Sequence, residues 1–335
     1  MRTILKLLYP VVVFLIVFML TYVLFYRMAK KYRTVPKGEP IKTDLGFAYE
    51  TDEEIEEVEM PSFDIDLRLI KAVDKLQQHG SPEIAPVNFE KFNYMLNPRG
   101  ACDGFRKEAN ASYVLVLVKS APDHARLRQW LRVLMNDTKG RFGQHLRLLF
   151  LLGFSKKSNR DIYLEGTKYG DIIQRDFIDT YRNLTFKTKM GYEWAMSFCK
   201  PASFIVFQDD DFFINVKNVF DFLSRQYKPD ELFTGHLVPA GASVVRERAS
   251  KWFVSNILFS SDAFPPYFPG GSYMVSSRIA KRLTLAFPYV QDIPVDDVYL
   301  GLVASKLGIP LKHSSLFDFA SCQNWNKCLA CKAFI

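Results

Sequence analysis

Three short apolar runs separated by helical patterns constrain the fold of this chain most strongly. The runs span residues 114–118, 146–152 and 204–207, and apart from Arg147 they consist of aliphatic or aromatic side chains. Such runs are typical of strands that are buried on both faces of a sheet. Helical patterns occupy residues 124–135 and 183–199 between the runs. Because strands that alternate with helices build parallel sheets, the sequence predicts an α/β domain with a mostly parallel central sheet.

Other segments extend this prediction. The polar segment after Gly153 has helical character, and we expect it to stay helical as far as Asp179. Helical patterns at residues 216–225 and 277–286 predict two more helices in the same domain.

Three adjacent carboxylates, Asp209, Asp210 and Asp211, follow the third apolar run. In an open α/β sheet, ligands bind beyond the carboxyl ends of the strands, so acids at that edge are well placed for chemistry. Adjacent acids repel one another, and hard oxygen ligands suit Mg²⁺ or Mn²⁺, which bridge carboxylates to the phosphates of a substrate. By itself, the triplet is equally compatible with an acidic turn that caps a helix.

Further candidate residues lie toward the end of the chain. The acidic pair Asp296 and Asp297 precedes a helical stretch, so one carboxylate can act as a general base or simply cap the helix. Residues 265–273 combine prolines, aromatics and paired glycines, which is typical of a rigid loop that a ligand approaches, or of a structural turn. His313 is a candidate metal ligand or an ordinary packed residue. The sequence contains no Walker loop, dinucleotide fingerprint or nucleophile elbow.

The amino-terminal region predicts a membrane anchor. Residues 7–26 carry no charge and are long enough to cross a bilayer as a helix, behind a short tail of residues 1–6. The basic residues that follow make a poor signal-peptide cleavage site. Positive charge, taken alone, would leave the long carboxyl-terminal portion in the cytoplasm. Three glycosylation sequons, at Asn110, Asn136 and Asn183, favour a lumenal location instead.

Cysteine usage is also compatible with an oxidising compartment. The five cysteines are Cys102, Cys199, Cys322, Cys328 and Cys331. Their odd number leaves one thiol free or paired between chains. The cluster at the end of the chain lacks the second Cys or His pair of a zinc site, so a disulfide or an idle thiol is the better interpretation.

Composition separates a stem from a folded domain. Hydrophobic residues make up 48% of the chain and aromatic residues 15%, which is enough for a packed core. Residues 27–105 contain several prolines and an acidic run, so we expect a solvated stem there and the folded domain over residues 106–335. Much of the formal net charge of +8 lies just behind the apolar span, and no basic stripe with interleaved aromatics indicates a nucleic-acid partner.

Taken in order, segments of the folded domain resemble one family, the β-1,3-glycosyltransferases of glycosyltransferase family 31. The family includes β-1,3-galactosyltransferases and β-1,3-N-acetylglucosaminyltransferases. The matching segments are residues 116–122, 150–153, 169–174 with 176–177, 181–185 with 187–188, 209–211, 265–267 and 296–299. Residues 233–236 and 251–255 are most similar to the brainiac-like subgroup, which extends glycolipid sugars.

The resemblance implies a GT-A-type nucleotide-sugar-binding fold over residues 106–335, a UDP-sugar donor and a divalent metal, Mn²⁺ or Mg²⁺. It also implies a single-pass type II protein of the Golgi membrane, with the catalytic domain in the lumen. It assigns Asp211, with Asp209, to the metal on the donor diphosphate, and His313 to a further metal ligand. It places Asp297 where the family has the base that deprotonates the acceptor. The donor-binding residues that it implies are Asp209, Asp210 and Arg132.

Some positions depart from the family pattern. The first helix keeps Arg132 but lacks the Thr-Trp pair that commonly follows, and Gln208, Ser272 and Asp296 replace a basic residue, a glycine and a glutamate. Because no essential acid is lost, the resemblance implies an inverting β-1,3-glycosyltransferase. Its donor would be UDP-GlcNAc or UDP-Gal, and its acceptor the 3-hydroxyl of a glycan on a glycolipid or glycoprotein.

Two other classes of function remain open at this point. One is a catalytically silent lumenal relative that binds sugars. The other is a metal-dependent phosphohydrolase, which would need a second cluster of metal ligands, and the five histidines of the sequence do not indicate one.

Overall fold

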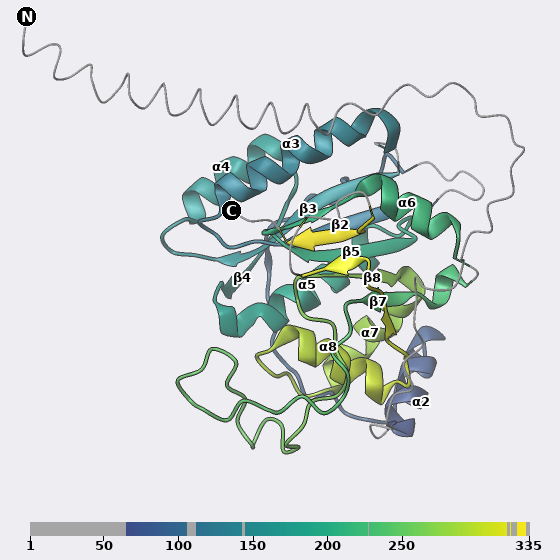
Figure 1. Ribbon diagram of the computed structural model, residues 1–335. Coiled ribbons are helices and arrows are strands. Elements are labelled where there is room, and N and C mark those ends of the chain that lie inside the picture. The colour runs from purple at the N-terminus through teal and green to yellow at the C-terminus, as the bar shows by residue number, and fades with distance from the viewer. Residues whose placement is uncertain are drawn as a thin grey trace, which may run out of the picture. The chain divides into compact units, whose positions relative to one another are not determined.

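A computed structural model gives the arrangement of the chain (Figure 1). It describes residues 65–105, 112–142, 145–226, 228–319, 322 and 327–332. The predicted tail and anchor (residues 1–26) and the sequon at Asn110 lie outside these residues. In the described part of the chain, no helix has the length and apolar character needed to cross a bilayer.

Helices and strands alternate through most of the described chain. The α-helices are α2 (Leu67–Gln77), α3 (Ala125–Phe142), α4 (Asn159–Tyr169), α5 (Leu184–Phe198), α6 (Val216–Ser224), α7 (Ser277–Ala286) and α8 (Asp296–Lys306). The 3₁₀ turns are η1 (Tyr181–Asn183), η2 (Pro229–Glu231) and η3 (Phe287–Tyr289). The strands are β1 (Tyr94–Leu96), β2 (Val114–Lys119), β3 (Leu146–Phe154), β4 (Ile172–Ile178), β5 (Phe204–Asp209), β6 (Phe212–Ile214), β7 (Phe233–Gly235), β8 (Ser272–Ser276), β9 (Lys312–His313), β10 (Phe317–Asp318) and β11 (Ala330–Lys332).

The main sheet is mixed, with a parallel centre. Its strand order is β1-β4-β3-β2-β5-β8-β7-β9. Strands β4, β3, β2 and β5 run parallel, whereas β1 and β8 are antiparallel to their neighbours β4 and β5. The three apolar runs form the three central strands β2, β3 and β5, so the predicted α/β class is confirmed.

Strand β4 corrects one prediction. The sequence predicted helical structure up to Asp179, but the helix α4 ends at Tyr169 and a seven-residue strand follows. Its polar residues find partners in the folded protein: Gln174 donates a hydrogen bond to the carbonyl of Gly153 at 2.9 Å, and Arg175 pairs with Glu193. Because these partners are distant in sequence, the local pattern does not reveal the strand.

Alternation along β2 divides the core into two layers. Its three valines face a layer that includes side chains of α3, α4 and α6, and its two leucines face a layer with α2, α5, α7 and α8. In Figure 1, α3 and α4 accordingly cover one side of the sheet, and α5, α7 and α8 cover the other. Every residue of β2 is buried, which explains why its sequence does not alternate between apolar and polar side chains.

The end of the predicted stem belongs to the folded unit. Helix α2 begins after Asp66, whose carboxylate accepts hydrogen bonds from two backbone N–H groups, and it buries Leu69 and Val73 in the core. Strand β1 pairs with β4 at the edge of the sheet. The folded unit therefore begins before residue 106, since the apolar face of α2 is covered by α7 and α8.

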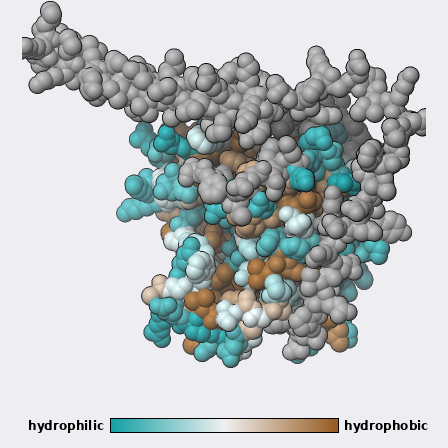
Figure 2. All heavy atoms as spheres, viewed as in Figure 1, coloured by the Kyte–Doolittle hydropathy of each residue, from teal (hydrophilic) through white to brown (hydrophobic). Residues whose placement is uncertain are grey.

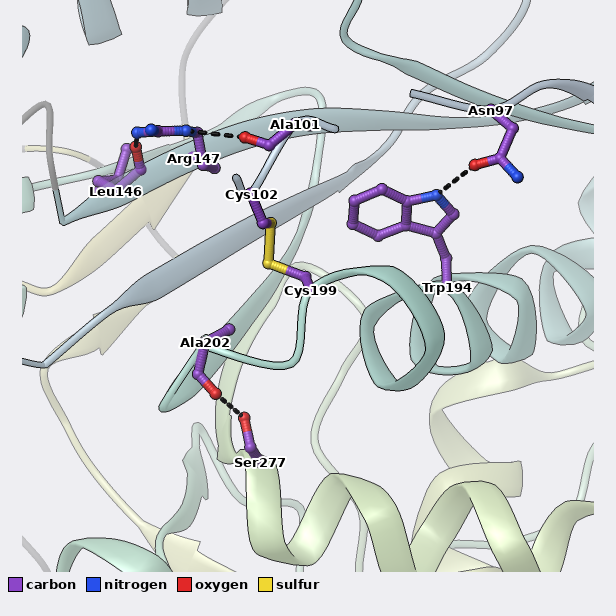
Figure 3. The surroundings of a disulfide bond; sticks show 9 residues. All are labelled: Asn97, Ala101, Cys102, Leu146, Arg147, Trp194, Cys199, Ala202 and Ser277. Atoms are coloured by element: carbon purple, nitrogen blue, oxygen red, sulfur yellow. Dashed lines mark hydrogen bonds between the residues drawn. A yellow bond between two sulfur atoms is a disulfide. The ribbon is translucent and has the colours of Figure 1, made fainter. Parts of the chain in front are cut away.

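A disulfide ties this segment to the domain. Cys102 is bonded to Cys199, which follows α5, with a Cα–Cα distance of 5.3 Å (Figure 3). Around it, the Trp194 indole donates a hydrogen bond to the Asn97 side chain at 2.9 Å, and Arg147 donates one to a backbone carbonyl at 2.9 Å. A cross-link that closes a loop of this size, a sequence separation of 97 residues, stabilises a domain by about 3–5 kcal/mol.

A small second sheet holds the carboxyl-terminal segment. Its strand order is β10-β11-β6, so β11 lies beside the strand that follows the acidic triplet. Cys331 in β11 is bonded to Cys322, and Cys328 is buried outside the two disulfides. The disulfide that the sequence favoured over a zinc site is confirmed.

Candidate active site

The carboxyl ends of β2 and β5 meet at one point, where a buried lysine faces the acidic triplet. Lys119 ends β2 and is directly opposite Asp209, the last residue of β5, in the parallel register. The Lys119 ammonium group lies 3.1 Å from Oδ1 of Asp209. The parallel pairing thus places one positive and one negative charge at the edge where ligands bind in α/β sheets.

The same lysine reaches the second acidic pair. Its ammonium group donates a hydrogen bond to Oδ2 of Asp296 at 3.0 Å, and Thr188 of α5 donates to the same oxygen at 2.6 Å. Burial by itself would raise the pKa of Asp296, but Lys119 and these hydrogen bonds hold it below its ordinary value. Asp296 therefore carries a fixed negative charge inside the protein.

Asp297 occupies the first turn of α8 beside this charge. Its Oδ2 accepts a hydrogen bond from the Gly270 N–H at 3.3 Å, and its Oδ1 accepts one from the Val298 N–H at 2.8 Å. Desolvation and the neighbouring charge of Asp296 raise the pKa of Asp297 to about 7, although Lys119 acts in the opposite direction. Neither acid caps the helix, because the N-cap residue is Val295. A half-buried carboxylate that titrates near neutrality is suited to general base catalysis.

The three acids of the triplet have different environments. Desolvation raises the pKa of Asp209 to about 6; Lys119 opposes this shift and Asp296 adds to it. Asp210 is buried, and its Oδ2 lies 2.9 Å from Nδ1 of His124 and accepts a hydrogen bond from the Ala121 N–H. Asp211 lies 3.6 Å from the Lys332 ammonium group, with 38% of its side chain exposed. Asp209 is similarly accessible, at 41%. Asp209 and Asp211 are thus the two triplet carboxylates that a ligand can reach.

The paired glycines allow the predicted rigid loop to approach these acids. A Cβ atom on Gly270 would lie 2.9 Å from the Lys119 ammonium nitrogen, and one on Gly271 would lie 2.3 Å from the Phe212 ring. The Gly271 carbonyl accepts a hydrogen bond from the Asp209 N–H at 2.9 Å. Any larger residue would displace the Lys119 ammonium group or the Phe212 ring, so the backbone itself forms one wall of the site.

Two carboxylates fit a divalent metal, and Nδ1 of His313 has a structural contact. It accepts a hydrogen bond from the Leu237 N–H at 3.1 Å. The role of His313 as a further metal ligand stays a prediction. In the described chain, no group of three His, Cys, Asp or Glu side chains is arranged as a metal site. The exposed oxygens of Asp209 and Asp211 are hard donors that suit Mg²⁺ or Mn²⁺.

Arg132, expected at the donor, belongs to a separate cluster of charges. Its guanidinium makes a bidentate contact with Asp171, at 2.7 and 2.8 Å, and a third contact with Glu165 at 2.7 Å. Arg128, one turn earlier in α3, donates to both oxygens of the same glutamate. We call these four residues the arginine cluster. Since its partners lie on α4 and before β4, Arg132 joins α3 to the neighbouring elements, and its role at the donor stays a prediction.

The structure also adds residues that the sequence analysis missed. Lys119 and Thr188 bring Asp209 and Asp296 together, and Lys187 donates hydrogen bonds to the Ser120 carbonyl at 2.7 Å and to Asp179 at 2.9 Å. We call Lys119, Asp209, Asp296 and Asp297 the acid cluster. Two features of the sequence could have indicated these residues. Lys119 ends an apolar run, and Lys187 and Thr188 lie in an apolar helix. Polar residues at such positions are buried only when they have partners.

Two of the sequons lie in the described part of the chain. Asn136 is exposed on α3, and Asn183 ends η1 with its amide donating to the Ile178 carbonyl at 2.9 Å. The sequon threonine Thr185 is buried and donates to the Ile293 carbonyl. Asn136 is therefore the more accessible of these two positions.

Comparison with known proteins identifies the family. The sequence profile described as galactosyltransferase matches residues 127–315, a range that contains Arg128, both acidic segments and the glycine loop. The chain belongs to the galactosyltransferase family. The resemblance inferred from ordered motifs is thereby confirmed.

Individual relatives agree with this assignment. The chain is 38% identical over 208 residues to "Beta-1,3-galactosyltransferase brn" of Drosophila melanogaster, which confirms the similarity to the brainiac-like subgroup. It is 34% identical over 216 residues to "Acetylgalactosaminyl-O-glycosyl-glycoprotein beta-1,3-N-acetylglucosaminyltransferase" of Mus musculus. It is 31% identical over 240 residues to "Beta-1,3-galactosyltransferase 1" of Homo sapiens.

The matches cover parts of each protein. They include 61%, 62% and 70% of this galactosyltransferase-family chain, and 63%, 55% and 72% of the fly, mouse and human relatives. Among solved structures, a galactosyltransferase in complex with donor and acceptor sugar analogues aligns with a TM-score of 0.35 and 14% identity, over 66% of this chain and 86% of its own.

Proposed function

We propose that this chain is an inverting β-1,3-glycosyltransferase that transfers galactose or N-acetylglucosamine from a UDP-sugar to the 3-hydroxyl of an acceptor glycan. The observation that carries the proposal is the placement of Asp297. It is a half-buried carboxylate with a pKa near neutrality, and Asp296 and Lys119 connect it to the acids at the end of β5. The names of the relatives, which specify β-1,3 transfer of these two sugars, support the reaction class.

Asp297 would accept the proton of the attacking hydroxyl group. A base is most effective when its pKa lies near the working pH, and the raised pKa of Asp297 meets this condition. Direct displacement at the anomeric carbon needs one such base on the face of the sugar opposite the leaving group, and it inverts the configuration. Asp296 stays ionised and increases the basicity of Asp297 by its charge.

Asp209 and Asp211 would hold a divalent metal at the donor diphosphate. Such a metal, when bound, stabilises the negative charge on the departing diphosphate. The ion pair with Lys119 holds Asp209 in place. The contacts of Asp210 with His124 and the Ala121 N–H fix the turn that carries Asp209 and Asp211. The Gly270–Gly271 backbone limits the space beside them. The resulting arrangement agrees with a GT-A-type donor site.

We also propose that the protein is anchored in the Golgi membrane, with residues 7–26 as a type II signal anchor and the catalytic domain in the lumen. The uncharged apolar run supports the anchor. The sequons support a lumenal domain, as do the two disulfides, because disulfides persist in oxidising compartments. The acceptor would be the glycan of a glycolipid or glycoprotein.

A donor panel tests the proposed reaction. The full chain is incubated with UDP-galactose or UDP-N-acetylglucosamine, Mn²⁺ and a set of β-glycosides, and the linkage of any product is determined by NMR. We expect a β-1,3 product with one donor strongly preferred. Asp297→Ala should lower the transfer rate by about 10²–10⁴-fold, the usual contribution of a general base.

Two further variants complete this test. Asp211→Ala should abolish the stimulation by Mn²⁺, whereas Asp221→Ala, at an exposed ion pair with Lys217, serves as the matched control. Transfer at the wild-type rate by the Asp297→Ala variant would show that Asp297 is not the base. Binding of a sugar without transfer or hydrolysis of any donor would favour a catalytically silent relative instead.

A further inference from the structure

An exposed aromatic group lies on the loop that follows β7, next to the turn η1. The Lys251 ammonium group lies 5.0 Å from the ring centroid of Tyr181 in η1 and 4.7 Å from that of Trp252. Trp252 is 50% exposed and Tyr181 is 42% exposed. One cation thus joins two aromatic rings from distant parts of the chain, and both rings retain accessible surface.

Two arginine side chains hold the loop that carries this group by donating hydrogen bonds to its backbone carbonyls. Arg182 donates a hydrogen bond to the Phe253 carbonyl at 3.4 Å and lies over the Phe253 ring at 5.8 Å. Arg246 donates to the carbonyls of Val254 at 2.9 Å and Ser261 at 2.6 Å. These contacts fix residues 246–261 as a folded excursion, so the aromatic rings have defined positions.

Two contacts connect the segments around the aromatic group to helix α8, which carries Asp297. Helix α5 starts directly after η1, and one turn into it Thr188 bonds to Asp296. Gly301 lies one turn after Asp297 on the same face of α8, and a Cβ atom there would lie 2.8 Å from Cβ of Tyr267. Electrostatics agree with this placement. Burial raises the pKa values of Tyr181 and Tyr267, and the charge of Asp297 raises both further.

We propose that Trp252, Tyr181 and Lys251 form the acceptor subsite, in which the exposed indole face packs against the pyranose ring whose hydroxyl group faces Asp297. This inference rests on the proposed transferase function and specifies where that site binds its acceptor. Tyr267, which packs against Gly301 of α8, forms the other boundary of the subsite.

The chemistry of the group suits a sugar ring better than a phosphate or a peptide. A pyranose presents C–H bonds on its faces and hydroxyl groups on its rim, and a half-exposed indole offers a flat apolar surface with a polar edge. The Lys251 ammonium group and the Tyr181 hydroxyl can donate hydrogen bonds to the hydroxyl groups on the rim. Sites of this kind combine aromatic walls with a few placed polar groups.

The surface around the group is apolar as well. Ile257 is 96% exposed and Leu258 is 37% exposed on the same loop. Figure 2 shows hydrophobic atoms interrupting the hydrophilic surface over the lower part of the molecule, the part of the view in which Figure 1 draws this loop. These two side chains do not contribute a cation or an aromatic face, so a membrane contact is the competing use of the loop and an outcome of the test.

The experiment compares Trp252→Ala, Trp252→Phe and a matched control, Trp130→Ala, in the full chain. Trp130 is 43% exposed on α3, on the other side of the sheet from α8. Transfer to methyl β-galactopyranoside and methyl β-glucopyranoside is measured against acceptor concentration at saturating UDP-sugar. Hydrolysis of the UDP-sugar without acceptor is measured in parallel. Binding of each glycoside is followed separately by intrinsic tryptophan fluorescence.

We expect Trp252→Ala to raise the acceptor KM at least tenfold and Trp252→Phe to raise it only a few fold, because the phenyl ring keeps part of the stacking surface. Donor hydrolysis and the Trp130→Ala variant should stay at the wild-type level. An unchanged acceptor KM in Trp252→Ala would overturn the proposal and leave membrane contact as the use of the loop. The two proposals can also be separated. If no sugar is transferred from any donor, the transferase function is wrong. The subsite is still supported in that case if glycosides quench the tryptophan fluorescence of the wild type but not that of Trp252→Phe.

Discussion

Two clusters of buried charge adjoin the end of β2, and they are balanced differently. The arginine cluster contains two cations and two carboxylates, whereas the acid cluster contains one cation and three carboxylates. In the first, contacts with Arg128 and Arg132 hold the pKa of Glu165 below its ordinary value although burial acts the other way. In the second, the pKa values of two carboxylates rise to about 6 and about 7.

This difference separates structural from chemical use of buried charge. In a balanced cluster each charge has a partner of opposite sign, so the cluster holds helices together. An unbalanced cluster leaves carboxylates that gain stability from a proton or a cation. The surplus of negative charge in the acid cluster therefore identifies it as the place for a base and a metal.

Removal of the single cation from the acid cluster should have the largest effect. Lys119→Met would leave the buried Asp296 without a counter-charge and the partly exposed Asp209 without its partner, and breaking a buried pair by removing one partner costs about 3–5 kcal/mol. We expect at least a hundredfold loss of transfer, together with lower stability in urea unfolding. Near-wild-type transfer by the folded variant would mean that Lys119 does not position the acids.

The arginine cluster should respond in stability alone. Arg132→Met removes the guanidinium that joins Asp171 and Glu165, which should destabilise the domain by about 3 kcal/mol. We expect the kcat of the folded fraction to change by less than twofold. A large increase in the donor KM at unchanged stability would instead support the donor-binding role that the sequence suggested for Arg132.

The pH dependence of transfer should report the acid cluster. A base must be deprotonated, so transfer should fall about tenfold per pH unit as the pH decreases below the Asp297 pKa of about 7. Asp296→Asn removes a negative charge that raises this pKa, so the midpoint of the acidic limb should move to lower pH. A midpoint that stays unchanged in that variant would contradict the coupling between the two aspartates.

An exposed pair gives the smallest effect and the baseline for the comparison. Lys217 and Asp221 form an i,i+4 pair on the surface of α6, with 61% and 53% of their side chains exposed. Because water and salt screen such pairs, Lys217→Met should change the free energy of unfolding by less than about 0.5 kcal/mol and leave transfer unchanged. A loss near that of Arg132→Met would show that burial does not distinguish the clusters.

The positions of the central strands were predictable because full burial leaves a local signal in the sequence. Strands β2, β3 and β5 are each dominated by an apolar run, and such runs are recognised without knowledge of their neighbours. Strand β4 gave no such signal, because Gln174 and Arg175 are satisfied by side chains from other elements. The segment 65–105 was assigned to the stem for a similar reason, since only α7 and α8 cover the apolar face of α2.

Ordered motifs in the sequence determined the family, the parallel sheet and the acids that can carry the reaction. They are local properties of neighbouring residues, so the chain specifies them by itself. Only the tertiary structure decided which charges share one site. Lys119 meets Asp296 across 177 residues, and Arg132 meets Asp171 across 39. The pKa of Asp297 depends on that arrangement, because burial and the distance to other charges arise only when the strands and helices pack together.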